Sequence, residues 1–215
     1  MSLPLNTVSS PPTILGKEAK KTARKSPPPR RQPNATTRTR EHLLPDEVDR
    51  VLKAVRKNRN AARDYAFLLV MFRRALRVSE AIRLKWADVD LLDERIYVRR
   101  LKNGVPSTQP LSGIELRALK LLRRKNPSSQ WVFLSERGGP MTRRNAHAII
   151  AKAGRDAKIS FPVHPHNLRH SLGYYMSEKG VPTRSLAAYM GHKNLNNCAR
   201  YLALSSTHFK DWWED

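Results

Sequence analysis

The sequence predicts a mainly α-helical domain with one small antiparallel β-sheet, an α+β fold. Two observations predict this class. Apolar residues recur at helical spacing in most segments after residue 43, as at Val48 and Leu52. The strand signal is confined to one region, where the apolar stretch Ile96–Val98 is soon followed by Asn103 and Gly104, a strong hairpin-turn pair.

The first 40 residues differ in composition from the rest of the chain. Residues 1–40 hold 7 of the 15 prolines and nine Lys or Arg against one Glu, which is a net charge of +8. They lack the apolar clusters needed for a core, so we expect a disordered, basic, proline-rich arm. Such an arm is either a solvated linker or a source of extra phosphate contacts. Residues 41–215 then form one folded domain.

The charge of the whole chain points to a polyanionic partner. The chain has 41 Lys and Arg against 18 Asp and Glu, a net charge of +23. Nucleic acid is favoured over a membrane surface, because the sequence shows no amphipathic anchor, no lipidation signal and no apolar run long enough to span a bilayer. Cys198 is the single cysteine and is interpreted as a packing residue. A reducing compartment and a cytoplasmic, DNA-associated location are expected.

Capping residues and apolar spacing place the helices. Pro45 suits a first helical turn, and Thr142 suits an N-cap. Gly180 and Gly191 are expected to close two helices. In chain order, we expect a helix from Pro45 carrying Val48 to Val55, then Ala61–Arg74 with Tyr65, Leu68, Leu69 and Phe72 inward, Val78–Leu84, Glu115–Lys125, Thr142 to about Ala157, His166–Lys179, Pro182–Met190, Leu195–Ala203, and a terminal helix holding Phe209, Trp212 and Trp213.

The middle of the chain carries the strands. Ile96–Val98 is expected to pair with Thr108–Leu111, which places Lys102 near the hairpin tip. Trp131–Leu134 is either a third strand or an extended core segment. Gly138–Pro140 is expected to turn the chain before the following helix.

The last third of the chain carries residues suited to phosphate chemistry. His166 and Arg169 are three residues apart, so a helix would present a proton carrier and a two-pronged phosphate clamp on one face. A metal site at His164, His166 and His170 is disfavoured, because no carboxylate or closed ligand set is nearby. By themselves, His164 is interpreted as structural and His170 as a satisfied helix histidine. No metal or cofactor is expected.

Three further positions complete the candidate set. Arg77 comes just before a predicted helix, and Glu80 follows one turn later, where it can buttress the guanidinium. His192 follows Gly191, and Tyr201 comes nine residues later. Alone, His192 is typical of a helix cap and Tyr201 of a half-buried core tyrosine. A tyrosine hydroxyl is also a nucleophile that can form a covalent intermediate.

Taken together, these motifs resemble the catalytic domain of the tyrosine recombinases, the phage integrase family. The resemblance runs in order over about residues 43–215, through Leu-Arg-Val-Ser-Glu, a hairpin lysine, His-x-Leu-Arg-His, Gly-His and the tyrosine. Ile96–Lys102, Trp131–Ser135 and His164–His170 resemble the short fimbrial phase-switch recombinases in particular. That subgroup inverts a promoter segment and has no separate core-binding domain, which is also our expectation here.

The resemblance implies a role for each motif residue. Tyr201 would attack a DNA phosphate and form a 3′-phosphotyrosyl bond. Arg77 and Arg169 would clamp the non-bridging oxygens, and His192 would donate a further hydrogen bond. The field of these cations replaces a metal, and the covalent bond stores the phosphodiester energy, so ATP is not required.

The remaining roles concern protons and DNA contacts. The resemblance implies that His166 assists proton transfer at the tyrosine and that Lys102 protonates the departing 5′ oxygen. Glu80 and His170 would be supporting residues. The expected DNA-binding residues are Arg73, Arg74, Arg99, Arg100, Arg143 and Arg144.

The family also implies partners and rivals to this interpretation. Family members act as homotetramers on two sites in double-stranded DNA, with accessory DNA-bending proteins as further partners. Phe209, Trp212 and Trp213 would either dock onto a neighbour or close the protomer's own core. The rival functions are a catalytically inactive DNA-binding regulator and a type IB topoisomerase-like relaxing enzyme. One departure is Ala75, where the family commonly has Gly, the residue preferred at positive φ.

Overall fold

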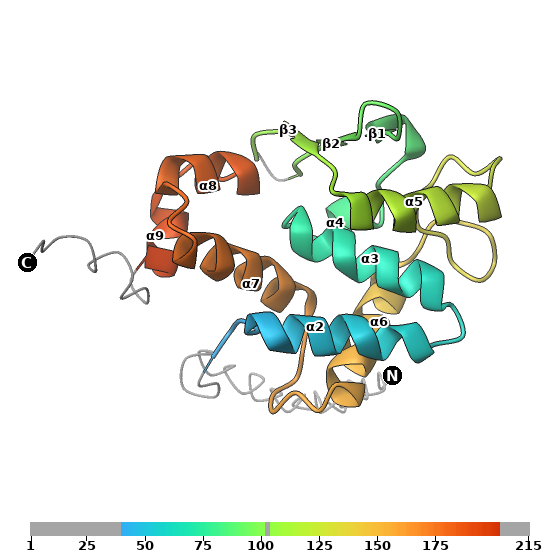
Figure 1. Cartoon of the computed structure of the whole chain (residues 1–215), viewed down its shortest axis with the longest axis horizontal. Coiled ribbons are helices and arrows are strands. Elements are labelled where there is room, and N and C mark those ends of the chain that lie inside the picture. Colours follow the sequence, from blue (N-terminus) through green and yellow to red (C-terminus); the bar gives the residue numbers. More distant parts are fainter. Residues whose placement is uncertain (1–39, 102–103, 203–215) are drawn as a thin grey trace, which may run out of the picture. The chain divides into compact units, whose positions relative to one another are not determined.

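The computed structural model of the chain describes residues 40–101 and 104–202. Within these ranges, the structure is mainly helical, with a small antiparallel sheet at one edge beside the helices Val78–Ala81 and Gly113–Lys125 (Figure 1), so the predicted fold class is confirmed. The boundary at residue 40 stays a prediction, because residues 1–39 lie outside the described residues. The elements are α2 (Pro45–Ala54), η1 (Val55–Lys57), α3 (Ala61–Arg73), α4 (Val78–Ala81), η2 (Trp86–Asp88), β1 (Val89–Asp90), β2 (Arg95–Val98), β3 (Ser107–Pro110), α5 (Gly113–Lys125), α6 (Arg143–Asp156), α7 (Pro165–Glu178), α8 (Thr183–Met190) and α9 (Asn196–Leu202).

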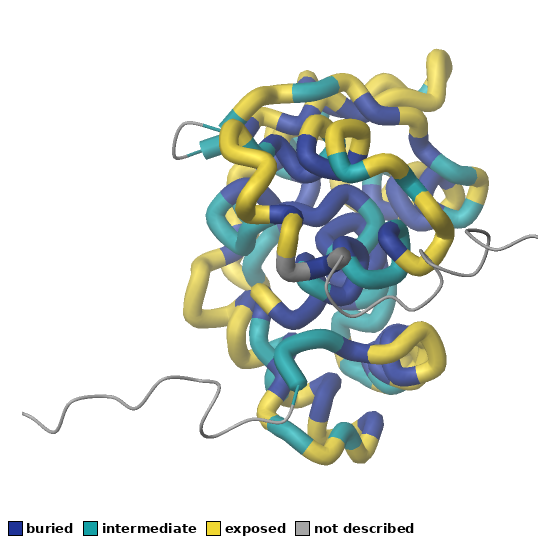
Figure 2. Tube along the Cα trace, turned by 90° about the vertical axis from the view of Figure 1, so that its left-hand side faces the viewer, coloured by how far each residue is buried: buried dark blue, intermediate teal, exposed yellow. Residues whose placement is uncertain are grey.

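Helix α3 runs through the main hydrophobic core. It packs against α5 and α7, and its residues 66–71 are all buried. Phe67 meets Phe133 edge to face, with 5.2 Å between the ring centroids. Leu68 and Leu69 point inward as predicted, whereas Tyr65 and Phe72 are half-buried at the margin of the core. Figure 2 shows the buried positions gathered along the inner sides of the helices.

The sheet contains the predicted hairpin and one strand that was not predicted. β2 pairs antiparallel with β3, with Ile96 opposite Gln109, and β1 covers the other edge of β2. The segment 131–134 is therefore the extended core alternative: only its ends form isolated bridges, from Trp131 to Lys85 and from Leu134 to Pro140. The strand that was not predicted, β1, has only two residues, which is too short for an alternating pattern to be detected. Lys102 lies outside the described residues.

Helix ends follow the capping residues identified in the sequence. Thr142 accepts a hydrogen bond from the backbone N–H of Asn145, at 3.1 Å, and so caps α6. Gly180 and Gly191 adopt φ values of 73° and 69°, the left-handed conformation that ends α7 and α8. Helix α4 ends at Ala81 rather than at Leu84 as predicted. Leu84 instead accepts a backbone hydrogen bond from Val132, which draws this segment into extended pairing.

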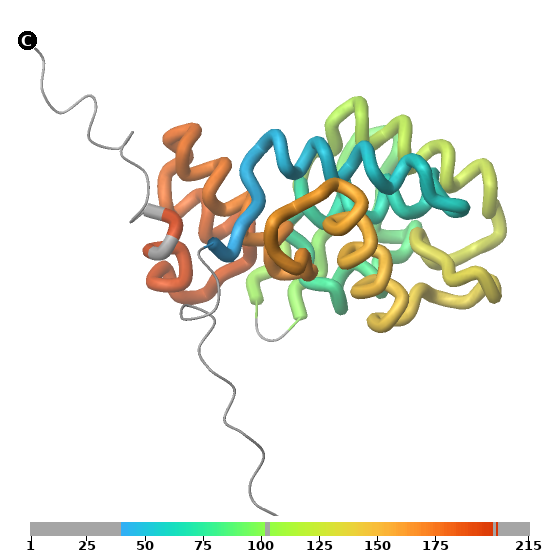
Figure 3. The backbone as a smooth tube through the Cα atoms, turned by 90° about the horizontal axis from the view of Figure 1, so that it is seen from below, coloured from blue at the N-terminus to red at the C-terminus, as the bar shows by residue number. Residues whose placement is uncertain are grey.

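The last three helices form a second, smaller core. α7, α8 and α9 contact one another, and Leu172, Leu186, Met190 and Tyr201 are buried between them. Figure 3 shows these C-terminal helices gathered beside the start of α2. No helix in the described ranges is both long and apolar enough to cross a membrane.

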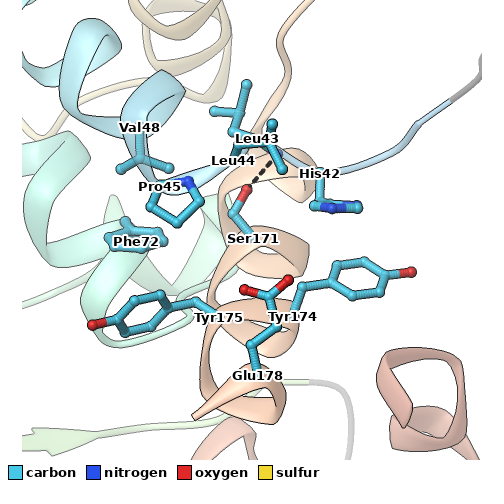
Figure 4. Close-up of a pocket in the computed structure, with 10 residues that line it drawn as sticks. All are labelled: His42, Leu43, Leu44, Pro45, Val48, Phe72, Ser171, Tyr174, Tyr175 and Glu178. Carbon is cyan, nitrogen blue, oxygen red and sulfur yellow. Dashed lines mark hydrogen bonds between the residues drawn. The ribbon is translucent and has the colours of Figure 1, made fainter. Parts of the chain in front are cut away.

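The segment that leads into α2 is attached to α7. The backbone N–H of Leu43 donates to Ser171 Oγ at 2.7 Å, and the His42 ring lies 3.8 Å from the Tyr174 ring, centroid to centroid (Figure 4). The hollow beside these residues has about 10 Å³ of free space, close to the minimum for one water molecule. It is therefore a packing junction and not a ligand pocket.

Candidate active site

Arg77 is held in place by the turn that starts α4. Its backbone N–H and its Nη1 donate to the two carboxylate oxygens of Glu80, at 2.9 and 2.8 Å. Glu80 is buried and also accepts from the backbone N–H of Leu101, at 3.2 Å, in the segment that follows β2. The i, i+3 spacing therefore produces a capping interaction that orients the guanidinium and joins it to the hairpin.

Ala75 supplies the acceptor that joins two more arginines. Its φ is 48°, the left-handed region that a non-glycine residue adopts at some strain. In this conformation its carbonyl oxygen accepts from Arg169 Nη1 and, at 3.2 Å, from Arg100 Nη1. The strained backbone at the end of α3 thus orients a carbonyl toward two guanidinium groups.

Arg169 is a buried cation on α7. Its Nη2 donates to the carbonyl of Met190 at 2.8 Å, which ties α7 to the end of α8. Burial, followed by repulsion from Arg100 and Arg77, lowers the Arg169 pKa to about 10. At neutral pH the group stays charged, so the protein maintains concentrated positive charge that an anion in the site would neutralise.

Arg100 links these parts together. Its side chain is 0% exposed, and its guanidinium donates to Glu80 Oε2 at 3.0 Å. It also donates to the carbonyls of Arg74 and Tyr189, at 3.1 and 2.7 Å. A Cβ on Gly191 would lie 2.6 Å from Arg100 Cγ, so the glycine permits α8 to end directly against this side chain.

Two of the predicted DNA-binding arginines, Arg74 and Arg100, are buried. Arg100 is enclosed, and Arg74 is buried in an ion pair with Glu115 at 2.7 Å while donating to the carbonyl of Pro110 at 2.6 Å. In this structure both guanidinium groups therefore donate to acceptors within the protein. That Arg74 and Arg100 contact DNA stays a prediction, and a run of arginines in the sequence does not show which of them the fold turns inward.

The other four predicted DNA-binding arginines reach the surface. The Arg99 side chain is 70% exposed beside Asp88, and that of Arg73 is 38% exposed beside Ser112. Arg143 and Arg144 are exposed in the first turn of α6. Cations at the positive end of a helix are unfavourable by a few tenths of a kcal/mol to about 1 kcal/mol each. Arg143 and Arg144 therefore do not stabilise the N-terminus of α6 through the helix dipole.

Tyr201 lies in the second core with its hydroxyl on a histidine. Its side chain is buried at 1% exposure, and its hydroxyl is 3.1 Å from His170 Nδ1. The ring packs directly on Gly173 of α7, where an added Cβ would come within 2.6 Å of a ring carbon. Tyr174 meets the same ring edge to face, at 5.1 Å between centroids. His170 was predicted only as a supporting residue, and its contact with Tyr201 was not predicted.

The two remaining histidines flank this arrangement. His166 is exposed on the first turn of α7, with its ring 6.3 Å from that of His170, centroid to centroid. His192 follows the left-handed Gly191, and its Nδ1 lies 3.1 Å from Cys198 Sγ. No group of three His, Cys, Asp or Glu side chains is arranged to hold a metal within residues 40–101 and 104–202.

Three of the described candidates, Arg77, Arg169 and Tyr201, are therefore linked through shared neighbours. Arg77 shares Glu80 with Arg100, Arg100 shares the Ala75 carbonyl with Arg169, and Arg169 lies on the helix that holds Tyr201. Lys102 and the aromatic residues Phe209, Trp212 and Trp213 lie outside the described residues.

Sequence reasoning missed the residues that organise the cluster. Ala75 carried a usable signal, since it stands where the resembling family has a residue tolerant of positive φ. No sequence signal indicated the hydrogen bond from Arg100 to the Tyr189 carbonyl or the contact of Cys198 with His192. Each joins residues that lie in different segments of the structure.

Comparison with known proteins agrees with this geometry. Residues 41–208 match the Phage integrase family. The type 1 fimbriae regulatory protein FimB of Escherichia coli (strain K12) is 37% identical over 185 residues, covering 84% of this chain and 92% of FimB.

Two solved structures share the fold. The crystal structure of XerA recombinase superposes with a TM-score of 0.70 and 25% identity over 87% of this chain and 65% of that one. The structure of XerH site-specific recombinase bound to palindromic difH substrate has a TM-score of 0.69 and 19% identity, over 80% of this chain and 52% of that one. This chain thus spans nearly all of FimB but only about half to two thirds of the two solved chains. The match over most of its length shows that the chain belongs to the phage integrase family and is a site-specific DNA recombinase of the tyrosine class.

Proposed function

We propose that this protein cuts and rejoins double-stranded DNA through a bond between Tyr201 and a 3′ phosphate, and that it inverts a DNA segment. One observation carries the proposal: Arg77 and Arg169 belong to one hydrogen-bonded cluster, and the residue after Arg169 on α7, His170, contacts the Tyr201 hydroxyl. Paired guanidinium donors match the oxygens of a phosphodiester, and a phenol is a competent nucleophile. Kinship with FimB, a regulator of type 1 fimbriae, favours inversion among the possible outcomes.

In the proposed cleavage step, one bond to phosphorus forms as another breaks. The Tyr201 oxygen attacks phosphorus, the bond to the 5′ oxygen breaks, and a 3′-phosphotyrosyl bond forms. Arg77 and Arg169 neutralise the charge that builds on the non-bridging oxygens, and His192 donates a further hydrogen bond. Lys102 gives the leaving 5′ oxygen its proton. Attack by a 5′-hydroxyl of another strand reverses the step and rejoins the DNA.

The phenol proton has a path through two imidazoles. A free tyrosine has a pKa of about 10, so its proton must be accepted as the bond to phosphorus forms. His170 already contacts the hydroxyl, and His166 lies beyond it on the solvent side of α7. We assign the first acceptor role to His170 and the transfer to solvent to His166.

The DNA partner is supported by charge and by the exposed arginines. The net charge of +23 favours a polyanion. We assign phosphate contacts to Arg73, Arg99, Arg143 and Arg144, whose side chains reach the surface. The XerH structure holds a related fold on its DNA substrate. We further propose a homotetramer on two sites, with accessory DNA-bending proteins and with Phe209, Trp212 and Trp213 as docking residues. Such a protein would work in the cytoplasm, on the nucleoid.

The test is a nicked suicide duplex that carries the cognate site, which is sought among short inverted repeats in the DNA around the gene. The wild-type protein should form a covalent adduct that survives denaturing electrophoresis. Tyr201→Phe should form none while it binds the same duplex with unchanged affinity, because only the hydroxyl is removed. Tyr65→Phe is the matched control: it removes a hydroxyl from a half-buried ring on α3 and should leave the adduct yield unchanged.

Other outcomes select the rival functions. Tight binding to a verified site without any adduct would favour a DNA-binding regulator. Relaxation of any supercoiled plasmid, without strand exchange, would favour a topoisomerase. An adduct that persists in Tyr201→Phe would overturn the assignment of the nucleophile.

A further inference from the structure

We infer that Cys198 is a positioning residue that sets the tautomer of His192, so that the Nε2–H of this histidine faces the DNA phosphate. The inference rests on the proposed function and adds a residue to it. Cys198 Sγ lies 3.1 Å from His192 Nδ1, within hydrogen-bond distance for sulfur. The two ring nitrogens of a neutral histidine differ, and the partner of one decides which of them carries the proton.

Burial makes the thiol the donor of this pair. Cys198 is 0% exposed within the second core, and burial raises the pKa of the thiol although the charge of Arg169 opposes this. The sulfur therefore keeps its hydrogen at neutral pH and donates it to Nδ1. A neutral imidazole whose Nδ1 accepts a hydrogen bond carries its proton on Nε2. That proton is the donor that the phosphate requires.

The backbone and the thiol divide the positioning of His192. The backbone N–H of His192 donates to the carbonyl of Ala187 at 2.8 Å, and Gly191 before it is left-handed, so the end of α8 fixes where the side chain starts. The thiol then selects the rotation and the tautomer of the ring. A ring with the proton on Nδ1 would present a lone pair to an anionic oxygen, which is repulsive.

Cys198 also connects His192 to the nucleophile. Cys198 and Tyr201 are three residues apart on α9, and both are buried against α7 and α8. Positions at this spacing share one helix face. One face of α9 therefore places the Tyr201 ring in the second core and the Cys198 thiol against His192 Nδ1. A residue that only fills space would have no effect on the histidine.

The experiment compares single-turnover cleavage of the suicide duplex by three variants between pH 5.5 and 8.5. Cys198→Ala removes the donor, and Cys198→Ser replaces it with a hydroxyl of similar size. Leu186→Val loosens the same core cluster without touching His192. Rates are expressed relative to wild type at each pH. The effects of the nearby groups Arg100, Arg169, Tyr189, Lys193 and Tyr201, and of the proton acceptors His166 and His170, therefore cancel, because the variants share them with the wild type.

The expected result depends on pH in a way that packing cannot reproduce. At pH 8, Cys198→Ala should cleave about 3- to 10-fold more slowly, the effect of one neutral hydrogen bond, with unchanged DNA affinity. The deficit should shrink as the pH is lowered and the His192 imidazole is protonated, because a protonated imidazole carries hydrogen on both nitrogens. Cys198→Ser should stay near wild type, and Leu186→Val should show no pH-dependent deficit.

A second measurement separates this inference from the proposed function. Nitrogen-15 chemical shifts of His192, recorded in the full chain without DNA, report the tautomer directly. The Nε2–H form is expected in wild type and a mixture in Cys198→Ala. If wild type forms no adduct, the proposed function fails while the tautomer is still measured. An Nδ1–H tautomer in wild type would overturn the inference. A deficit that is equal at all pH values and shared by Cys198→Ser would overturn it too.

Discussion

At the scale of single residues, the strained backbone of Ala75 positions two of the clustered arginines, Arg100 and Arg169. Its φ of 48° turns one carbonyl toward two guanidinium groups, while its methyl group is buried in the second core. A left-handed alanine costs about 1–2 kcal/mol relative to the right-handed conformation. Burial of the methyl group stabilises the folded state by about 0.8 kcal/mol. Alanine also has a lower conformational entropy than glycine in the unfolded chain, which further favours folding.

We therefore expect Ala75→Gly to be almost neutral, within about 1 kcal/mol of wild type, because relief of strain and loss of the methyl group cancel. Ala153→Gly is the control: Ala153 is equally buried, but in the interior of α6, so it should lose about 1–2 kcal/mol. Urea unfolding measures both changes. A loss of 2 kcal/mol or more in Ala75→Gly would show that the left-handed backbone is not strained.

Glu80 connects the cluster to acid stability. Burial acts to raise its pKa, but the backbone N–H of Arg77 and the charges of Arg100 and Arg77 outweigh burial, and the pKa lies below its ordinary value. The folded protein thus keeps this carboxylate ionised at a pH where the unfolded chain has begun to protonate it. Its contribution to stability is complete above about pH 4.5 and is lost as the pH falls through the lowered pKa.

Glu80→Gln should destabilise the protein by about 3–5 kcal/mol at pH 7, because the enclosed charge of Arg100 loses its counter-ion. The gap between variant and wild type should shrink as the pH falls through the lowered pKa of the Glu80 carboxylate, because the wild type then loses the same charge. Urea unfolding at a series of pH values measures this. Glu136→Gln, at an exposed side chain, should change stability by less than about 1 kcal/mol at every pH. A gap that does not vary with pH would contradict the ion-pair role.

At the scale of elements, the contact between α7 and α9 decides where the nucleophile rests. Glycine inside a helix usually costs about 1 kcal/mol relative to alanine. Gly173 lies within the 14-residue helix α7, yet the Tyr201 ring fills the space that a methyl group would need. The glycine therefore serves the close approach of α9.

Gly173→Ala should lower the free energy of unfolding by about 1–2 kcal/mol, since overpacking outweighs the gain in helix propensity. Amide hydrogen exchange in α9 should accelerate, because the ring is displaced from its seat. Gly113→Ala is the control: its added Cβ would meet only the end of the Arg117 side chain, 3.5 Å away, so stability should stay level or rise. A more stable Gly173→Ala with slow exchange in α9 would refute this packing.

At the scale of the whole molecule, charge should govern the affinity for DNA. Each phosphate that a Lys or Arg neutralises contributes about −0.9 to the slope of log K against log salt concentration. We expect deletion of residues 1–40, which carry +8, to make this slope shallower, and Arg143→Ala to reduce its magnitude by about 0.9. Filter binding between 50 and 300 mM salt measures both. An unchanged slope after the deletion would identify the arm as a solvated linker.

Local sequence determines many of the helices and helix ends of this protein. The helix over Ala61–Arg73, the cap at Thr142 and the left-handed Gly191 each depend on residues within one or two turns, and each was predictable. Sequence spacing also placed His166 and Arg169 on one helix, because a helix brings residues three apart onto the same face.

Only the tertiary structure distinguished residues of one type from each other. Arg99 and Arg100 are neighbours in the chain, yet one reaches solvent and the other lies under Gly191, bonded to three separate segments. The contact of His170 with Tyr201 and that of His192 with Cys198 likewise join different helices or helix ends. The physical reason is that local spacing sets backbone geometry and facing, whereas burial and partners depend on which distant segments the core brings together.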